Sequence, residues 1–379
     1  MKKRIVFGIT CFIVLLACWI LWYYFLKNDS NWIWLSSSAR KSDWNLHILT
    51  SIDDEVVGDS MWCWTFQLVW NDMVNEVVKQ DVIFSPQLKI VENLNKQTFT
   101  KNELSPDSYY SKFWLLTLDL KAEIEKWIKE KFNETSDILD QWADWKNVPQ
   151  SDDFYEWKDE KKYWFYAMLK KIFKFENVFD ELDKWEFNNK YNDVKYFWIK
   201  WSSDSSLYKQ VYVYYYNSDD NFAVALKTNE WEDVILARWI WWNSFIDVYN
   251  NILKNEKKYE WKHNFTSHDF LKVPELDIKN KTNFWDLVEK EFYAKDWDKC
   301  KINKAMQTIE LKLDKEWGEV KSEAWIWMKK YSSSISGRPP KVEHRYFYFD
   351  KPYIIFLKEE NKDLPYFAAQ ISDITLFQD

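Results

Sequence analysis

Two strand-like runs near the C-terminus are separated by a connection that is too long for a hairpin. Residues 306–313 and 353–357 are rich in β-branched and aromatic side chains, which is typical of strands. A connection as long as the one between them either carries function or is disordered. The sequence therefore predicts a sheet with a long loop close to the end of the chain.

The first part of this connection alternates between two kinds of residue. Small or apolar side chains alternate with charged ones, which is the period-two pattern of a half-buried strand. A loop with this pattern can join a sheet where an edge or a gap is open. The small or apolar positions are Gly318, Val320, Ser322, Ala324 and Ile326, and the charged positions are Glu319, Lys321 and Glu323.

Tryptophan is far too frequent and glycine far too rare in this chain. It has 27 Trp and 4 Gly in 379 residues, whereas glycine usually makes up about 7% of a protein. Our hypothesis is that the source organism reads as glycine a codon that was translated here as tryptophan. Several Trp occupy turn-like or loop-like sequence, where glycine's tolerance of positive φ is useful; they are Trp231, Trp239, Trp241 and Trp242. Other Trp, such as Trp70, fit a helix face.

Four blocks of sequence resemble the serpin family and occur in the family's order. Residues 308–324 resemble the hinge of the reactive-centre loop, in which Trp317 stands where the family has glycine. Residues 348–373 resemble the C-terminal signature and final hairpin. Residues 269–292 resemble a strand, turn and helix of the family, and residues 84–86 resemble a motif after an early helix. The resemblance implies an α+β fold with a large mixed or antiparallel sheet, several helices and an exposed reactive-centre loop near the C-terminus.

For function, the resemblance implies a serine-type endopeptidase inhibitor. A serine or cysteine peptidase would cut the loop, and the segment before the cut would insert into the large sheet as a new strand. Inserted side chains that face the core must be small or apolar, because a buried lone charge is costly. The hinge residues implied are Glu316, Trp317, Gly318, Glu319, Val320, Lys321, Ser322, Glu323 and Ala324.

The scissile bond has two candidate positions. The family's usual spacing from the hinge reaches Tyr331 and Ser332, whereas the downstream prolines favour Ser336 and Gly337, with Arg338 suited to a trypsin-like target. The resemblance also places Ser85 and Gln307 at the positions of the family's shutter serine and histidine. The helical part between residues 86 and 163 is shorter than is usual in the family, which leaves open which outer strands are present.

The N-terminal residues predict a tether outside the cytoplasm. Residues 1–26 begin with basic side chains and continue as an apolar run long enough for a signal anchor; a cleaved lipoprotein signal ending before Cys18 is the alternative. Residues 27–60 are polar and serine-rich and predict a linker. Residues 61–379 are the predicted serpin-like domain, which we expect to be a monomer at the cell surface or in the periplasm.

Other classes of function find less support. The net charge of −8 without a basic patch argues against nucleic acid. The four His lack ligand spacing, so neither a metal site nor a cofactor is expected. Cys63 at a predicted helix start, with His263 or His268 as a base, faintly resembles a cysteine peptidase; Cys63 and Cys300 are also the pair that could form a disulfide. A serpin-like binding protein without inhibitory activity is the main alternative.

Periodicity predicts several further elements. Helices are expected over residues 65–77, 105–132, 245–253 and 283–292, the second because Ser105 and Pro106 fit a helix start. Strands are expected over residues 163–175, 193–200, 207–216 and 221–228, and the turn between the last two predicts a hairpin. A helix-rich first half followed by a strand-rich second half is typical of an α+β domain.

Overall fold

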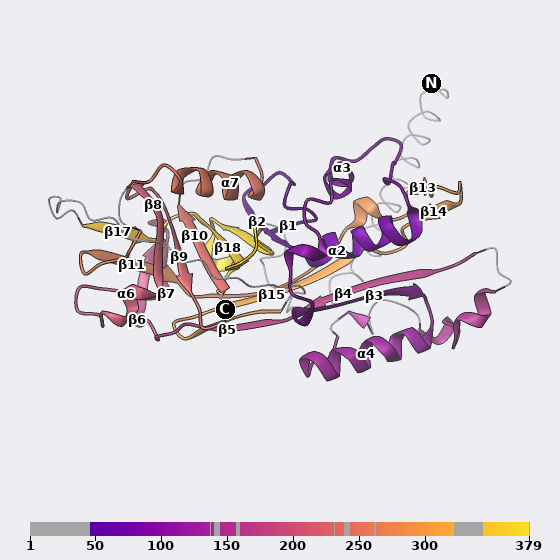
Figure 1. Cartoon of the computed structure of the whole chain (residues 1–379), viewed down its shortest axis with the longest axis horizontal. Helices are drawn as coiled ribbons and strands as arrows, with labels where there is room; N and C mark the ends of the chain where they lie inside the picture. Colours follow the sequence, from indigo (N-terminus) through magenta and orange to yellow (C-terminus); the bar gives the residue numbers. More distant parts are fainter. Residues whose placement is uncertain are drawn as a thin grey trace, which may run out of the picture. The chain divides into compact units, whose positions relative to one another are not determined.

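The computed structural model describes residues 46–136, 138–139, 145–156, 160–230, 232–238, 243–260, 263–321 and 344–378. Residues Asn45–Asp379 form one compact unit, and the predicted α+β class is confirmed by several sheets with few helices (Figure 1). The predicted anchor, residues 1–26, lies outside the described residues, as does most of the predicted linker. No helix within the described ranges is long and apolar enough to span a bilayer.

A seven-stranded sheet holds the largest part of the core. Its strands, in spatial order, are β1 (Leu46–Leu49), β2 (Asp59–Cys63), β19 (Phe367–Ile371), β18 (Tyr353–Glu359), β10 (Glu232–Arg238), β9 (Asn221–Lys227) and β8 (Val211–Ser218). Every residue of β18, β10 and β19 is buried, because these central strands are covered on both faces. The predicted strand at 353–357 and the hairpin of β8 and β9 are therefore confirmed.

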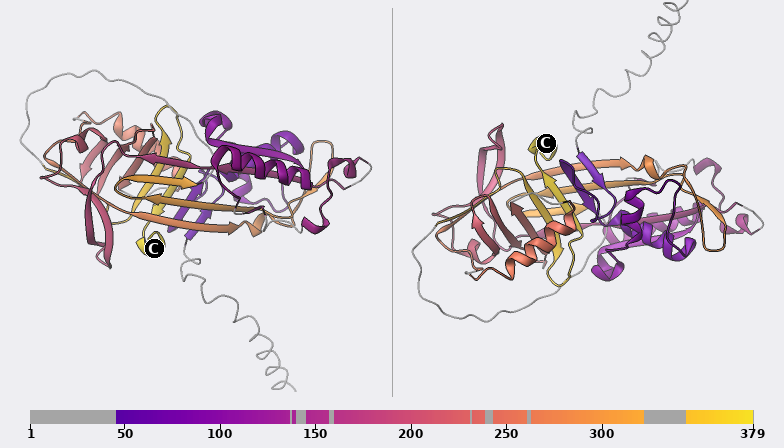
Figure 2. Two further views of the ribbon diagram at one scale, coloured as in Figure 1. Left: turned by 90° about the horizontal axis from the view of Figure 1, so that it is seen from below. Right: turned by 90° about the horizontal axis from the view of Figure 1, so that it is seen from above.

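The other strands form two four-stranded sheets and two two-stranded sheets. One has the order β17 (Arg345–Tyr348), β11 (Asp269–Pro274), β7 (Tyr191–Ile199) and β6 (Asp180–Phe187). The other has the order β12 (Leu276–Asn283), β15 (Met306–Leu313), β16 (Trp317–Lys321) and β5 (Lys171–Lys174), and Figure 2 shows its strands side by side. Two further sheets have two antiparallel strands each: β3 (Tyr109–Leu115) pairs with β4 (Tyr163–Leu169), and β13 (Glu291–Tyr293) pairs with β14 (Lys299–Lys301).

The helices cover the sheets through apolar stripes. Helix α7 (Phe245–Glu256) begins at the Ser244 cap and buries Phe245, Val248, Tyr249 and Ile252, a helical spacing. Helix α4 (Leu118–Phe132) begins at the Thr117 cap and buries Leu120, Ile124 and Ile128. The other α-helices of the described residues are α2 (Thr65–Asp72), α3 (Lys89–Asn95) and α6 (Ser206–Lys209).

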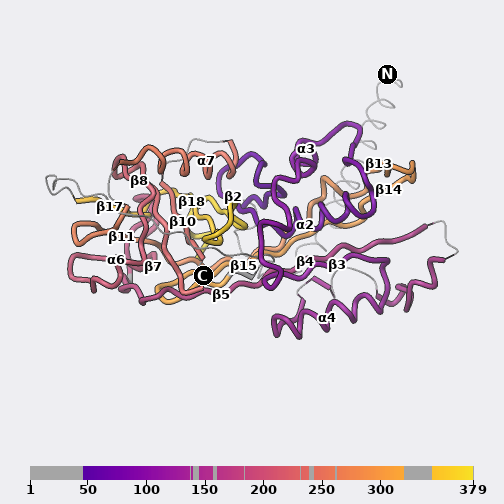
Figure 3. Tube along the Cα trace, in the orientation of Figure 1, coloured from indigo at the N-terminus to yellow at the C-terminus, as the bar shows by residue number. Residues whose placement is uncertain are grey.

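Helix α4 packs against strand β4 and holds it in position. Its apolar stripe packs against Trp164, Tyr166 and Met168 on one face of β4. The alternate residues of β4, on its opposite face, are less buried: Tyr163 is exposed, and Phe165 and Ala167 are half-buried. The trace runs from β4 almost directly into β5, with only Lys170 between them (Figure 3).

One predicted helix is confirmed only in its second half, as α4, and another is absent. Residues 109–115 of the predicted helix 105–132 form strand β3, because their aromatic side chains pair with those of β4, and the helix starts only after Thr117. The predicted helix 283–292 is absent: β12 extends to Asn283, a single 3₁₀ turn follows at Trp285–Leu287, and Glu291 begins β13. In both places cross-strand pairing overrides the local helical pattern.

Candidate functional site

The first part of the long connection turns back into the sheet. After β15, the carboxylate of Asp314 accepts hydrogen bonds from the backbone N–H groups of Glu316 (2.8 Å) and Trp317 (3.1 Å). The backbone N–H of Asp314 donates to the carbonyl of Trp317 (3.0 Å). This tight turn is typical of Asp side chains that bond the backbone two or three residues on. It directs the chain between two strands instead of away from the sheet.

Strand β16 is paired on both sides. On one side Gly318 lies opposite Leu313 and Lys321 lies opposite Glu310, both in antiparallel register. On the other side Gly318 lies opposite Phe173, and Val320 lies opposite Lys171. The segment that sequence alone identified as a potential strand is therefore a strand for residues 317–321, between β15 and β5.

The two faces of β16 differ as the alternation predicted. Gly318 is buried against Phe173, whose side chain is fully buried (0% exposed). Glu319 faces the other way, and its carboxylate is 3.6 Å from Lys170 Nζ. Trp317 shares the face of Glu319, with Lys312 Nζ 4.8 Å from its ring centroid. The hinge residues Ser322, Glu323 and Ala324 lie outside the described residues, as do Tyr331, Ser332, Ser336, Gly337 and Arg338.

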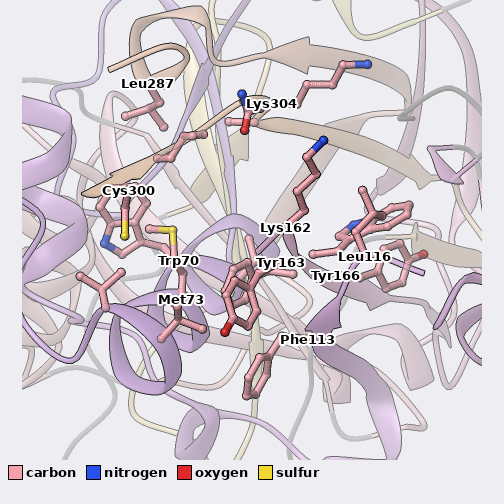
Figure 4. A pocket seen from close by; sticks show the side chains of 18 of the residues that line it. Trp70, Met73, Phe113, Leu116, Lys162, Tyr163, Tyr166, Leu287, Cys300 and Lys304 are labelled. Carbon is pink, nitrogen blue, oxygen red and sulfur yellow. The ribbon is translucent and has the colours of Figure 1, made fainter. Parts of the chain in front are cut away.

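A large cavity continues the line of β16. It has a volume of about 1550 Å³ and lies between β4 and the first half of β15. Within the described part of the chain, β4 pairs with β3 and β15 pairs with β12 and β16, and no pairing joins β4 to β15. Figure 4 shows the cavity between these strands, with Trp70 and Met73 of the α2 region and Cys300 of β14 among its walls.

The lining of this cavity suits an extended segment. Apolar side chains of the α2 region form much of one wall, including Phe66, Val69 and Trp70. Tyr163 to Met168 of β4 and Met306 to Thr308 of β15 contribute the two flanking walls. A strand placed here would meet an apolar surface on one face and backbone donors and acceptors along both edges.

Gln307 ties β15 to the start of α2 within this wall. Its amide Nε2 donates to the carbonyl of Cys63 (3.0 Å) and to Thr65 Oγ1 (2.7 Å), and the side chain is buried. Ser85, the predicted shutter partner, is exposed, and the hydroxyl bonded to Gln307 belongs to Thr65. Sequence reasoning missed Thr65, because 242 residues separate it from Gln307. The shutter roles stay a prediction.

A buried group of charges lies beneath the pairing of β5 with β16. Lys171, which opens β5, forms an ion pair with Glu232 at the start of β10. Its Nζ is also 3.8 Å from the carboxylate of Glu359 at the end of β18. Tyr366 donates its hydroxyl hydrogen to Glu232 (3.0 Å). These contacts link the sheet that holds β16 to the seven-stranded sheet.

Burial dominates the titration of this group. It raises the pKa of Glu359 to about 9, although Lys171, Lys362 and Lys358 act in the opposite direction. Burial lowers the pKa of Lys171, against the attraction of Glu359 and Glu230. Neither carboxylate oxygen of Glu359 accepts a hydrogen bond within the described part of the chain, which agrees with a protonated, uncharged carboxyl at neutral pH.

The cysteine-peptidase alternative does not match the geometry. Cys63 ends β2 and is fully buried (0% exposed), so a peptide cannot reach its thiol. His263 has its Nδ1 2.7 Å from the carbonyl of Val213 and stacks on Tyr212, and His268 is exposed beside β11. Cys300 is a free thiol in β14, so it forms no disulfide with Cys63.

Comparisons with known proteins found matches only among solved structures. No family model matches the sequence, and no curated protein matches it. The chain resembles Serpin48 of the insect Tenebrio molitor at 10% identity and TM-score 0.37, over 72% of this chain and 78% of that one. It resembles serpin-12 of Manduca sexta at 13% identity and TM-score 0.38, over the same shares.

A third solved structure is thyroxine-binding globulin in complex with thyroxine. It has 10% identity and TM-score 0.42, and the match covers 85% of this chain and 93% of that one. Identities and TM-scores this low do not establish a family or an activity for the chain.

Proposed function

We propose that this protein inhibits serine-type peptidases by a cleavage-and-insertion mechanism. A peptidase cuts the segment that follows β16, and the freed part enters the cavity between β4 and β15 as a new strand. The observation that carries this proposal is the double pairing of β16, whose line continues into that cavity. A strand that is already begun needs only to be extended.

The pairing register of β16 predicts which residues of β15 and β4 would lie beside residues 322–324 after insertion. Each step beyond Lys321 moves one residue along β15 and one along β4, so position 322 would lie between Ile309 and Leu169. Position 324 would lie between Gln307 and Ala167. These even positions share the inward side of Gly318, where Ser322 and Ala324 are small enough to be buried, while Glu323 would face outward.

The test is the formation of a covalent complex with a target peptidase. The full-length chain is incubated with chymotrypsin-like and trypsin-like peptidases and analysed on denaturing gels. The proposal expects an SDS-stable complex and a rise in the melting temperature of the cleaved chain, because a strand is added to the sheet. Sequencing of the released C-terminal fragment distinguishes the Tyr331–Ser332 bond from the Ser336–Gly337 bond.

Matched variants separate insertion from simple cleavage. Ala324→Arg places a charge at a position that would face the apolar wall, whereas Glu323→Arg changes the outward neighbour. The first should abolish both the complex and the thermal gain while cleavage continues, and the second should leave both in place. Equal behaviour of the two variants would contradict the insertion mechanism.

A binding protein without inhibitory activity is the second candidate. It is favoured by the fact that β16 is already paired in the uncut chain, which leaves less to gain from cleavage. Cleavage that yields neither a complex nor a higher melting temperature would support this candidate.

We also propose that the domain is tethered to a membrane outside the cytoplasm. The support is the apolar run of residues 5–26, which follows the basic side chains at residues 2–4. Membrane fractionation of the source cells, followed by protease treatment of intact cells, tests this proposal. Recovery of the chain in the soluble cytoplasmic fraction would contradict it.

A further inference from the structure

Two of the four histidines of the chain, His268 and His344, lie side by side on the surface. Their ring centroids are 5.8 Å apart, with an angle of 62° between the ring planes. Both residues are exposed. They are 76 residues apart in sequence, and they become neighbours because β11 and β17 pair in parallel with Asp269 opposite Arg345. His268 and His344 immediately precede these two strands.

The backbone that carries the two histidines is firmly held. Arg345 donates to both carboxylate oxygens of Asp269, from Nε (2.8 Å) and from Nη2 (2.7 Å). Asp269 is 2% exposed and also accepts from the backbone N–H and the hydroxyl of Thr266 (2.7 and 2.9 Å). Paired charges with several hydrogen bonds fix local geometry, so the two strand starts keep their relative position.

One ring nitrogen of His344 takes part in a hydrogen bond, which leaves the other for a ligand. Its Nδ1 lies 3.1 Å from the backbone carbonyl of His268, and a carbonyl oxygen only accepts hydrogen bonds. The neutral ring therefore carries its proton on Nδ1, and the lone pair is on Nε2. Histidines that bind metals usually donate their other ring nitrogen to a carbonyl or a carboxylate in this manner.

Aromatic side chains support the two imidazoles from the next positions along the strands. Phe270 stacks on Tyr346, with centroids 5.2 Å apart and an interplanar angle of 17°. The ring of Phe270 is also 5.8 Å from that of His344. The histidine pair thus lies at one end of an aromatic ladder on the surface of the sheet, which limits the directions in which the imidazoles can turn.

We propose that His268 and His344 together bind one divalent transition-metal ion, of the class that imidazole ligands favour: Zn²⁺, Ni²⁺ or Cu²⁺. Two imidazole nitrogens come from the protein. No group of three or more His, Cys, Asp and Glu gathers in the described ranges, so water completes the coordination shell. The bound ion bridges β11 and β17. The proposal is independent of the inhibitor mechanism.

The position of the site suggests what the ion does. His344 directly precedes β17, so an ion held there fastens the start of this strand to β11. An ion that binds the folded state alone raises stability by mass action. Metal binding at this site therefore links the surroundings of the protein to the stability of β17.

Titration calorimetry of the full-length chain with Zn²⁺ alone and Ni²⁺ alone, at pH 7.5, tests the proposal. His268→Gln and His344→Gln each remove one of the two protein ligands and should weaken binding by at least about 10-fold, because even the loss of an outer-shell partner of a ligand costs about 10- to 100-fold. Because both side chains are exposed, the variants should keep the far-ultraviolet circular dichroism of the wild type. His47→Gln, in β1, is the matched control and should bind as the wild type does.

Thermal unfolding gives the second measurement. Saturating Zn²⁺ should raise the melting temperature of the wild type and of His47→Gln, and should leave that of the double variant His268→Gln/His344→Gln unchanged. If either single variant binds Zn²⁺ as tightly as the wild type does, the ion is bound by other residues and the proposal is wrong. Absence of metal binding in the wild type at millimolar ion would overturn it equally.

Discussion

Gly318 lies so close to the ring of Phe173 that position 318 admits no side chain. A Cβ there would be 2.3 Å from Phe173 Cζ and 2.4 Å from Cε2. Phe173 has little room to move, because it is fully buried and contacts Phe175, whose ring in turn lies 4.8 Å from that of Phe179. The entry of β16 between its neighbours therefore depends on this glycine.

Gly318→Ala should lower the free energy of unfolding by about 1–3 kcal/mol, the usual cost of overpacking a core site. Urea unfolding of the uncut chain measures this change. Glu319→Ala is the matched control on the outward face of the same strand and should change stability by less than about 0.5 kcal/mol. Adding Phe173→Leu to Gly318→Ala should recover part of the loss, and a coupling energy of zero between the two changes would contradict the steric argument.

Gln307 should stabilise the wall of the cavity through its two hydrogen bonds. Gln307→Ala removes the bonds to Cys63 and Thr65, both buried, and should destabilise the chain by about 1–3 kcal/mol. Gln80 offers a control, because its side-chain amide donates to the backbone carbonyl of Tyr293 at an exposed site. Gln80→Ala should therefore lower the unfolding free energy by well under about 1 kcal/mol. Equal losses in the two variants would argue against a special role for the buried pair of bonds.

Glu359 should contribute a loss of stability as the pH rises, which the lowered pKa of its neighbour Lys171 opposes in the wild type. Its folded pKa is about 9, against 4.5 for an unperturbed glutamate. Between these values the folded state keeps a proton that the unfolded state has lost, so Glu359 lowers the unfolding free energy by up to about 1.4 kcal/mol per pH unit.

Glu359→Gln tests this statement. Gln resembles the protonated acid, so the variant should match the wild type near pH 4.5 and become progressively more stable than it up to pH 9. Urea unfolding at pH 5, 7 and 8.5 gives the comparison. A constant difference across this range would show that Glu359 keeps an ordinary pKa despite its burial.

The sequence patterns predicted β15 and β16 correctly, because in these strands the alternation of side chains agrees with the pairing in the sheet. Residues 306–313 alternate buried and less buried positions as β15, and the alternation around Gly318 continues in β16. The helix predicted from Ser105 fails because residues 109–115 meet β4, and the Pro106 signal belongs to a 3₁₀ turn instead. Contacts between distant segments, not local propensity, decide such cases.

Most of the remaining site depends on such distant contacts. Thr65 and Gln307, Lys171 and Glu232, and His268 and His344 come together only through the sheet topology. None of these pairs has a spacing that sequence analysis can recognise, which is why the four histidines showed no ligand pattern there. Of the Trp positions suspected to be glycine, Trp231, Trp239, Trp241 and Trp242 lie outside the described residues.

Trp297 is the sharpest structural test of the glycine hypothesis. It lies in the turn between β13 and β14 with φ of 70°, and its side chain is 82% exposed. The left-handed conformation costs a bulky residue roughly 1–2 kcal/mol, and nothing is gained from burial. Trp297→Gly should therefore raise the unfolding free energy by about 1 kcal/mol. Trp285 is the control, because its side chain is also exposed (72%) but its φ is not positive. Trp285→Gly should therefore leave the unfolding free energy unchanged or lower it.

Mass spectrometry of the protein purified from its source decides whether that glycine is already present. A tryptic peptide that spans position 297 should have the mass expected for Gly, because the turn selects a residue without a Cβ. The peptide that contains Trp70 should keep the Trp mass, since that indole is buried and donates to Asn95 at 3.3 Å. If both peptides have Trp masses, the turn at 297 carries genuine backbone strain and the codon hypothesis is wrong.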